Sequence, residues 1–138
     1  MAKVFRFGVS LEKKLLDKFD RLIKEKKYAN RSEAFRGLIR QELVKEEWRY
    51  GREVAGSVNL LYDHHKSELV NRLMDIQHDY QKLIISTQHI HLDHNNCLEI
   101  IAVKGAPEKV KKLADILKSV RGVKHGTLSM SSTGRAIE

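Results

Sequence analysis

The segment from His89 to Cys97 concentrates side chains that bind transition metals. It holds three of the seven histidines in the chain and the only cysteine. His89 and His91 are two residues apart, so on a β-strand both imidazoles leave the same face. Residues 93–96 are of types that favour turns, and a reversal there would return Cys97 opposite His91 and diagonal to His89. The spacing therefore predicts a hairpin that presents three metal donors on one face.

Imidazole and thiolate donors suit nickel, copper or zinc, and they suit magnesium or calcium poorly. A fourth ligand is needed, and spacing alone does not choose among the remaining histidines, which are His64, His65, His78, His94 and His125. A lone histidine is more often structural than a ligand, and this is our interpretation of His64, His65, His94 and His125. His94, on the predicted turn, could still bind extra metal weakly.

A cysteine near histidines could instead belong to an enzyme that uses a thiolate nucleophile. Here the thiol falls on a hairpin strand, and nothing in the sequence resembles a substrate pocket or an oxyanion hole. We therefore predict a metal-binding protein and not an enzyme.

The composition is that of a folded protein with one ordinary domain or two small ones. The chain has 138 residues, of which 41% are hydrophobic. No apolar run approaches the roughly 20 residues that span a bilayer, and the first residues lack the apolar stretch of a signal peptide. A single cysteine cannot form an internal disulfide, which fits a reducing compartment. We expect a cytoplasmic protein without a membrane segment.

The positive charge is concentrated in the first third of the chain. The net charge is +8, and residues 1–52 contain fifteen Lys and Arg against eight Asp and Glu. Such a segment is typical of a domain that binds a polyanion, although a solvated lysine-rich surface would have the same composition. The predicted elements of this segment are needed to decide between the two.

Residues 4–11 alternate between apolar and polar types, which predicts a half-buried strand. Ser10 is a plausible N-cap for an amphipathic helix that runs to about Lys27. Asn30 and Glu33 resemble a capping box at the start of a second helix, which runs to about Tyr50.

One strand and two helices bury too little surface to be stable alone, so we predict a dimer in which two such strands pair. The order strand, helix, Asn-Arg-Ser-Glu-Ala, helix resembles the ribbon-helix-helix DNA-binding proteins. A two-stranded ribbon fits the major groove of DNA, where Arg6 could read guanine and Ser10 could bond either donor or acceptor edges. Gly8 lies between them on the same face and offers no side chain. The resemblance implies that backbone N–H groups of Arg31 and Ser32 hold a phosphate.

Residues 54–130 predict a second domain with the order β-α-β-β-α-β. The expected elements are strands at 54–63, 84–92, 97–104 and 123–130, with helices from about 65 to 83 and after Pro107. This order is that of an α+β, ferredoxin-like (ACT-like) domain, whose two helices cover one face of an antiparallel sheet. The other face is free to meet another subunit. We divide the chain into a DNA-binding domain at 1–50 and a metal-binding, oligomerising domain at 51–138.

The whole chain resembles the NikR family of nickel-responsive repressors. The motifs that carry the resemblance are Gln77-His78, His89-x-His91, Cys97-Leu98-Glu99-Ile100 and residues 120–126, Val-Arg-Gly-Val-Lys-His-Gly. The resemblance implies that His89, His91 and Cys97 of one subunit and His78 of a neighbour bind Ni²⁺ in a square plane. It further implies that Lys66 contacts the DNA backbone. Residues expected to orient the metal ligands, from their neighbourhood and the family likeness, are Tyr62, Gln77 and Glu99.

The resemblance implies a homotetramer, a dimer of dimers, that binds double-stranded operator DNA of pseudo-palindromic sequence when nickel is bound. Its function would be to repress nickel-uptake genes. A linker around Gly51 and Gly56 would let the DNA-binding domains swing. In the family, Glu33 and a carboxylate at the position of Gly37 bind a second cation, and this chain lacks that carboxylate. Two alternatives remain open: the same architecture sensing copper or zinc, and a nickel chaperone that does not bind DNA.

Overall fold

The computed structural model describes residues 3–138, which form two compact units. The units divide between Arg40 and Gln41, within the second helix. The first half of helix α2 therefore belongs to the N-terminal unit, and its second half belongs to the C-terminal unit. The functional division at residue 50 stays a prediction.

The N-terminal unit contains helix α1 (Lys13–Glu25) and the first half of helix α2 (Arg31–Tyr50). The turn between them places Lys27 at a positive φ of 60°. The side-chain oxygen of Asn30 accepts a hydrogen bond of 2.9 Å from the N–H of Glu33, so the predicted cap of α2 is confirmed. The predicted start of α1 is wrong, because the helix begins at Lys13 with Glu12 as its N-cap residue instead of Ser10.

Residues 4–11 do not form the predicted strand within this chain. They have no assigned secondary structure, and Phe5 and Phe7 are 75% and 74% exposed. A strand exists only where another strand accepts and donates its backbone hydrogen bonds, and residues 3–138 of this chain supply no such neighbour. Pairing with a second copy stays a prediction.

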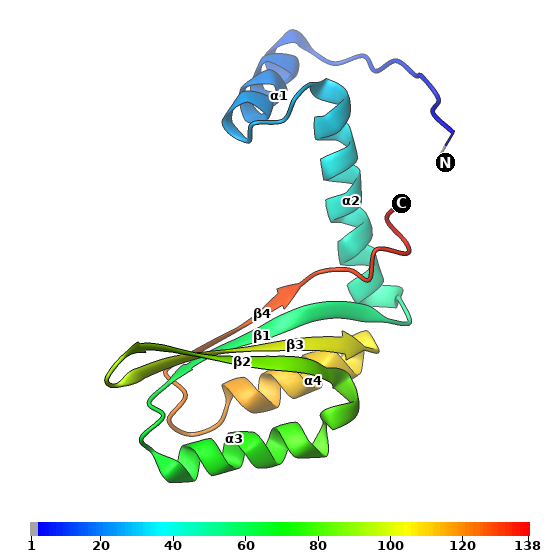
Figure 1. Ribbon diagram of the computed structural model, residues 1–138. Helices are drawn as coiled ribbons and strands as arrows, with labels where there is room; N and C mark the ends of the chain where they lie inside the picture. Colours follow the sequence, from blue (N-terminus) through cyan, green and yellow to red (C-terminus); the bar gives the residue numbers. More distant parts are fainter. Residues whose placement is uncertain (1–2) are drawn as a thin grey trace. The chain divides into compact units, whose positions relative to one another are not determined.

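The C-terminal unit is the predicted α+β domain. Its elements are strand β1 (Val54–Tyr62), helix α3 (Ser67–Asp79), a short 3₁₀ helix η1 (Gln81–Leu83), strands β2 (Ile84–Asp93) and β3 (Asn96–Gly105), helix α4 (Pro107–Lys118) and strand β4 (His125–Met130). The strands form one antiparallel sheet in the order β2-β3-β1-β4. Helices α3 and α4 lie on the same side of this sheet (Figure 1). The ferredoxin-like fold is thus confirmed.

Alternating residues of the central strands form the core beneath the two helices. In β1, Val54, Val58, Leu60 and Tyr62 are buried, and their neighbours in sequence are less so. The helices contribute the stripes Leu69, Leu73 and Ile76 from α3, and Val110, Leu113, Ala114 and Leu117 from α4. Because a one-residue slip of a strand would expose its whole buried set, this core fixes the register of the sheet and so the positions of the metal-binding side chains.

Candidate metal centre and nucleic-acid interface

The hairpin of β2 and β3 has the predicted register. His91 pairs with Cys97 across the two strands, and His89 pairs with Glu99. A two-residue turn at 94–95 joins the strands. The carboxylate of Asp93 secures the turn by accepting hydrogen bonds of 2.9 Å from the backbone N–H of Asn95 and from the side chain of Asn96. Two imidazoles and one thiol therefore lie on one face at the end of the hairpin.

The thiol of Cys97 is buried, with a residue exposure of 1%. Its nearest cross-strand neighbours are His91 on β2 and Tyr62 on β1. Burial raises the pKa of the Cys97 thiol, and the carboxylate of Glu99 raises it further. The thiol consequently keeps its proton at neutral pH unless a cation takes the proton's place.

A buried hydrogen-bond network lies beneath His89. Its centre is Glu99, which is 1% exposed. The hydroxyl of Tyr62 donates to one oxygen of Glu99 at 3.1 Å, and the amide of Gln77 donates to the other at 2.8 Å. His89 approaches the network with Nε2 3.5 Å from Glu99 and Nδ1 3.5 Å from the Tyr62 hydroxyl. Carboxylates placed in this way fix the orientation of an imidazole that binds a metal.

The three hairpin donors share a face, but their ligand atoms are not drawn together. His89 lies against the Glu99 network, whereas the ring of His91 packs against His64 with the centroids 4.5 Å apart. In the part of the chain that the structure describes, the metal-binding side chains whose donor atoms all lie within 4.8 Å of one another are Asp63, His64 and His65. In the single chain, each hairpin imidazole therefore contacts a residue outside the predicted donor set: Glu99 for His89, and His64 for His91.

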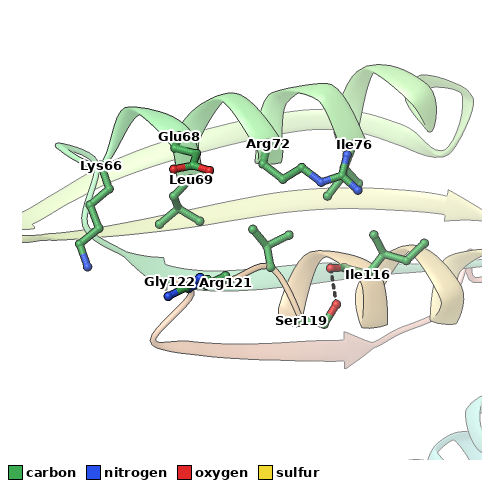
Figure 2. A pocket seen from close by; sticks show the side chains of 10 residues that line it. Lys66, Glu68, Leu69, Arg72, Ile76, Ile116, Ser119, Arg121 and Gly122 are labelled. Atoms are coloured by element: carbon green, nitrogen blue, oxygen red, sulfur yellow. Dashed lines mark hydrogen bonds between the residues drawn. The ribbon is translucent and has the colours of Figure 1, made fainter.

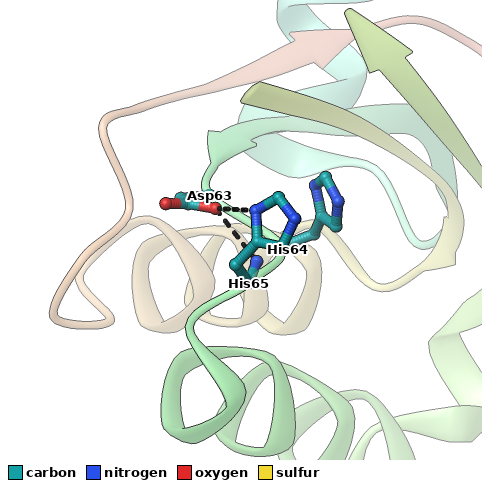
Figure 3. Close-up of side chains that lie close together, drawn as sticks. All are labelled: Asp63, His64 and His65. Atoms are coloured by element: carbon teal, nitrogen blue, oxygen red, sulfur yellow. Dashed lines mark hydrogen bonds and ion pairs between the residues drawn. The ribbon is translucent and has the colours of Figure 1, made fainter. Parts of the chain in front are cut away.

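A cluster of histidines adjoins the hairpin. The ring of His64 lies 4.1 Å from that of His65, and the ring of His65 lies 4.7 Å from that of His94. Asp63 accepts a hydrogen bond of 2.9 Å from the backbone N–H of His65 and lies 3.0 Å from its Nδ1 (Figure 3). The Nδ1 atom of His64 is buried and makes no hydrogen bond. Desolvation lowers the pKa of His64, and the neighbouring rings of His65 and His91 add to this effect.

From the sequence, these histidines were expected to be structural residues, each taken alone. The structure gathers His64, His65 and His94 beside His91. The signal available in the sequence was the adjacent pair His64-His65 directly after a strand that neighbours the hairpin. His125, in contrast, is at the start of β4, opposite Leu61.

His78 lies in the last turn of α3 and is exposed. The preceding residue, Gln77, turns inward to Glu99. The two residues of the Gln77-His78 motif therefore have different surroundings: one reaches the network under His89, and the other is accessible from outside the subunit.

The predicted DNA-contacting residues of the N-terminal unit are in two places. Arg6, Gly8 and Ser10 lie in the exposed segment before α1. Arg31 and Ser32 begin α2, where the helix dipole is positive. The side chain of Arg31 is held by Asp20 through hydrogen bonds of 3.0 and 2.9 Å, which lower the pKa of the Asp20 carboxyl.

Lys66 precedes α3 at the edge of a cavity of about 700 Å³ between α3 and the end of α4 (Figure 2). Two further basic residues, Arg72 and Arg121, line the same cavity, together with the acidic Glu68. Of these basic residues, only Lys66 was predicted from the sequence, since α3 and the loop after α4 are brought together only by the fold.

Gly37 supplies no carboxylate to the auxiliary cation site that the family resemblance implies. A Cβ atom at Gly37 would lie 2.6 Å from the hydroxyl of Tyr28, so a side chain in this position would require the ring of Tyr28 to move. Glu33 forms an ion pair with Arg36 on the next turn of α2.

Comparison with known proteins identifies both parts of the chain. Residues 55–131 match the family described as the NikR C-terminal nickel binding domain, and residues 6–46 match the ribbon-helix-helix proteins of the copG family. A DNA-binding unit of this kind followed by a metal-binding ferredoxin-like domain defines a metal-responsive transcription regulator. The chain belongs to the NikR family of nickel-responsive regulators, a family of transcription regulators and not of enzymes. The predicted family and its metal, Ni²⁺, are thereby confirmed.

Relatives are similar over almost their whole length. A protein of Syntrophus aciditrophicus is 57% identical over 135 residues, covering 98% of each chain. One of Chlorobium limicola is 59% identical over 134 residues, covering 97% of this chain and all of the relative, and one of Pyrococcus furiosus is 52% identical over 135 residues, covering 97% of this chain and 98% of the relative. All three are named as nickel-responsive regulators.

A solved structure of an uncharacterized protein from Thermotoga maritima resembles part of the chain. The TM-score is 0.51 at 10% sequence identity, and the match covers 56% of this chain and 96% of the other. This likeness supports the fold alone. Among the described residues, none of the helices is long and apolar enough to cross a membrane.

Proposed function

We propose that this protein represses transcription when Ni²⁺ occupies a site formed by His89, His91 and Cys97 of one subunit and His78 of another. The observation that carries the assignment is the hairpin register, which pairs His91 with Cys97 and sets His89 over Glu99. Three imidazoles with one thiolate are a donor set that nickel accepts, and bound nickel would hold these four side chains together.

The chain's own residues prepare this site. Glu99, held by Tyr62 and Gln77, would orient the ring of His89 through Nε2, and Nδ1 would leave the Tyr62 hydroxyl to bind the metal. Cys97 loses its proton to solvent on binding, and its burial removes competing water from the thiolate. His91 must turn from its packing against His64 toward Cys97. Binding thus changes the surroundings of three hairpin side chains at once.

The exposed position of His78 supports a site shared between subunits. If the fourth ligand comes from a second subunit, occupancy of the nickel site depends on assembly of the subunits. Nickel then favours the oligomeric arrangement that completes the site. The uncovered face of the sheet includes Leu61, Leu98 and Ile100, apolar residues suited to an interface between subunits. We infer a homotetramer in which two metal-binding pairs join two DNA-binding dimers.

A second copy also completes the N-terminal unit. A cavity of about 860 Å³ lies between residues 4–11 and the two helices, and its lining includes Phe7, Phe35 and Ile39. Pairing of two segments would cover these side chains and form the ribbon. Arg6 and Ser10 would then face the bases of a pseudo-palindromic operator, with Gly8 between them, and the N–H groups of Arg31 and Ser32 would meet phosphate.

In the C-terminal unit, Lys66 would contact the DNA backbone, together with Arg72 and Arg121 around the same cavity. We propose nickel-uptake genes as the targets, from the resemblance to the NikR family, and the cytoplasm as the location, since a DNA-binding regulator acts where the DNA is.

One titration tests the proposal. Nickel is added to the full-length protein with promoter DNA, and gel shift and absorption spectra are recorded together. We expect operator binding to begin as thiolate-to-nickel absorption bands of a planar complex appear. DNA binding that responds to zinc or copper but not to nickel would favour the alternative metals, and nickel binding without DNA binding would favour a chaperone.

A second site is supported by the cluster of Asp63, His64 and His65, which gathers three donor atoms within 4.8 Å. We propose that this cluster, with His94 at its side, takes up additional transition-metal ions weakly. Calorimetry of Cys97→Ala with nickel should show residual weak binding that disappears when His64 and His65 are replaced by Ala. Residual binding that survived those replacements would refute the assignment.

A further inference from the structure

The last turns of α2 are fixed to the C-terminal unit by Trp48. This side chain is 2% exposed and belongs to the core of the α+β domain. Its Nε1–H donates a hydrogen bond of 2.8 Å to the carbonyl of Ser131, in the tail after β4. The carbonyl of Trp48 accepts a hydrogen bond of 3.0 Å from the ammonium of Lys111 on α4. Lysine at this end also complements the negative end of the helix dipole.

A neighbouring residue strengthens the attachment. Glu47 is largely buried and accepts a hydrogen bond of 2.9 Å from the hydroxyl of Ser132. The backbone N–H of Ser131 donates to the carbonyl of Ala55 on β1 at 3.0 Å, so the tail is itself tied to the sheet. We name these residues the α2 clasp: Glu47, Trp48, Lys111, Ser131 and Ser132.

Strand β1 connects the α2 clasp with the candidate metal centre. At one end, a Cβ atom on Gly56 would be 3.4 Å from the indole ring of Trp48. At the other end, Tyr62 pairs with Cys97 and donates to Glu99. The two positions are six residues apart, or about 20 Å along a strand. Because β1 is hydrogen-bonded to β3 on one side and to β4 on the other, it does not bend freely between them.

The structure therefore differs from the expectation of a linker at Gly51 and Gly56. Gly56 lies within β1, and the N–H of Gly51 donates to the carbonyl of Glu47 at 2.7 Å. Both glycines belong to the compact C-terminal unit. A helix that leaves a rigid domain transmits a rotation of that domain, whereas a flexible linker would absorb it.

We propose that the α2 clasp makes the second half of α2 a rigid part of the metal-binding domain and thereby couples nickel occupancy to DNA affinity. This inference rests on the proposed function. Trp48 is a positioning residue in this scheme, since it lies apart from the metal ligands and acts through α2. Coupling between two ligands is the ratio by which one changes the affinity for the other, and it is reciprocal.

The test compares full-length Trp48→Ala with Tyr50→Ala, which removes an aromatic ring that is 81% exposed two residues further on. Nickel affinity is measured without DNA, and operator affinity with and without nickel. We expect Trp48→Ala to reduce the nickel-induced gain in operator affinity about tenfold, with nickel affinity in the absence of DNA unchanged. Tyr50→Ala should keep the whole gain.

Two milder variants guard against misfolding of Trp48→Ala. Trp48→Phe keeps most of the ring but not the bond to Ser131, and Lys111→Met removes the bond to the Trp48 carbonyl. Each should lower the gain in part. An undiminished gain in the folded variants would overturn the inference alone. Wild-type protein without any nickel-dependent operator binding would overturn the proposed function, and the inference with it.

Discussion

Glu99→Gln should weaken nickel binding without removing any metal ligand. Glu99 is buried and accepts hydrogen bonds from Tyr62 and Gln77 while it lies 3.5 Å from His89. A glutamine has one acceptor oxygen where the carboxylate has two, and its amide group would face another donor. One buried donor then lacks a partner, which costs about 1–3 kcal/mol of folding free energy.

Nickel affinity should fall because His89 loses the carboxylate that orients its imidazole ring. Removing a group that orients a metal-binding imidazole typically costs about 10–100-fold in affinity, or roughly 1.4–2.8 kcal/mol. Nickel affinity is measured by titration against a competing chelator, and stability by denaturant unfolding without metal. Glu53→Gln is the control, because Glu53 is a solvent-accessible carboxylate of the same domain, 3.9 Å from Lys104. Wild-type nickel affinity and stability in Glu99→Gln would refute the role of the network.

Three further outcomes test other parts of the scheme. His78→Ala and Cys97→Ala should each lose high-affinity nickel binding, but mixed oligomers should regain intact sites if two subunits share each ion; mixtures that stay inactive would contradict the shared site. Arg6→Ala should abolish operator-specific gel shifts and leave the oligomer intact in sedimentation, whereas unchanged operator affinity would exclude Arg6 as a base reader. Because burial raises the pKa of the Cys97 thiol, nickel must displace its proton, so affinity should rise with pH across the neutral range, by up to about tenfold per unit from this thiol; calorimetry in buffers of different ionisation enthalpy that detects no proton release would contradict this.

The hairpin could be predicted from the sequence because its determinants are local. The two-residue spacing of His89 and His91 and the turn-forming residues after Leu92 define which face each side chain takes. The structure has this register. The cap of α2 at Asn30 could be predicted for the same reason, because Asn30 and Glu33 are only three residues apart.

Features that depend on contacts between residues far apart in the chain could not be predicted from the sequence. The contact between Trp48 and Ser131 joins residues 83 positions apart, and no periodicity within α2 distinguishes a buried tryptophan at its end from an exposed one. The histidine cluster likewise arises because β1 ends next to the hairpin. The predicted strand at residues 4–11 differs for another reason: none of the strands within residues 3–138 pairs with it, and the partner that we propose is a second copy of the chain.

The burial of Cys97 has a consequence for the chemical lifetime of the sensor. Oxidants and alkylating agents react with exposed thiolates, and this sulfur is both enclosed and protonated at neutral pH in the single chain. A regulator that waits without its metal must keep its one thiol reduced through changes in cellular redox state. By withholding the sulfur from solvent, the sheet preserves the capacity to respond for as long as the chain stays folded.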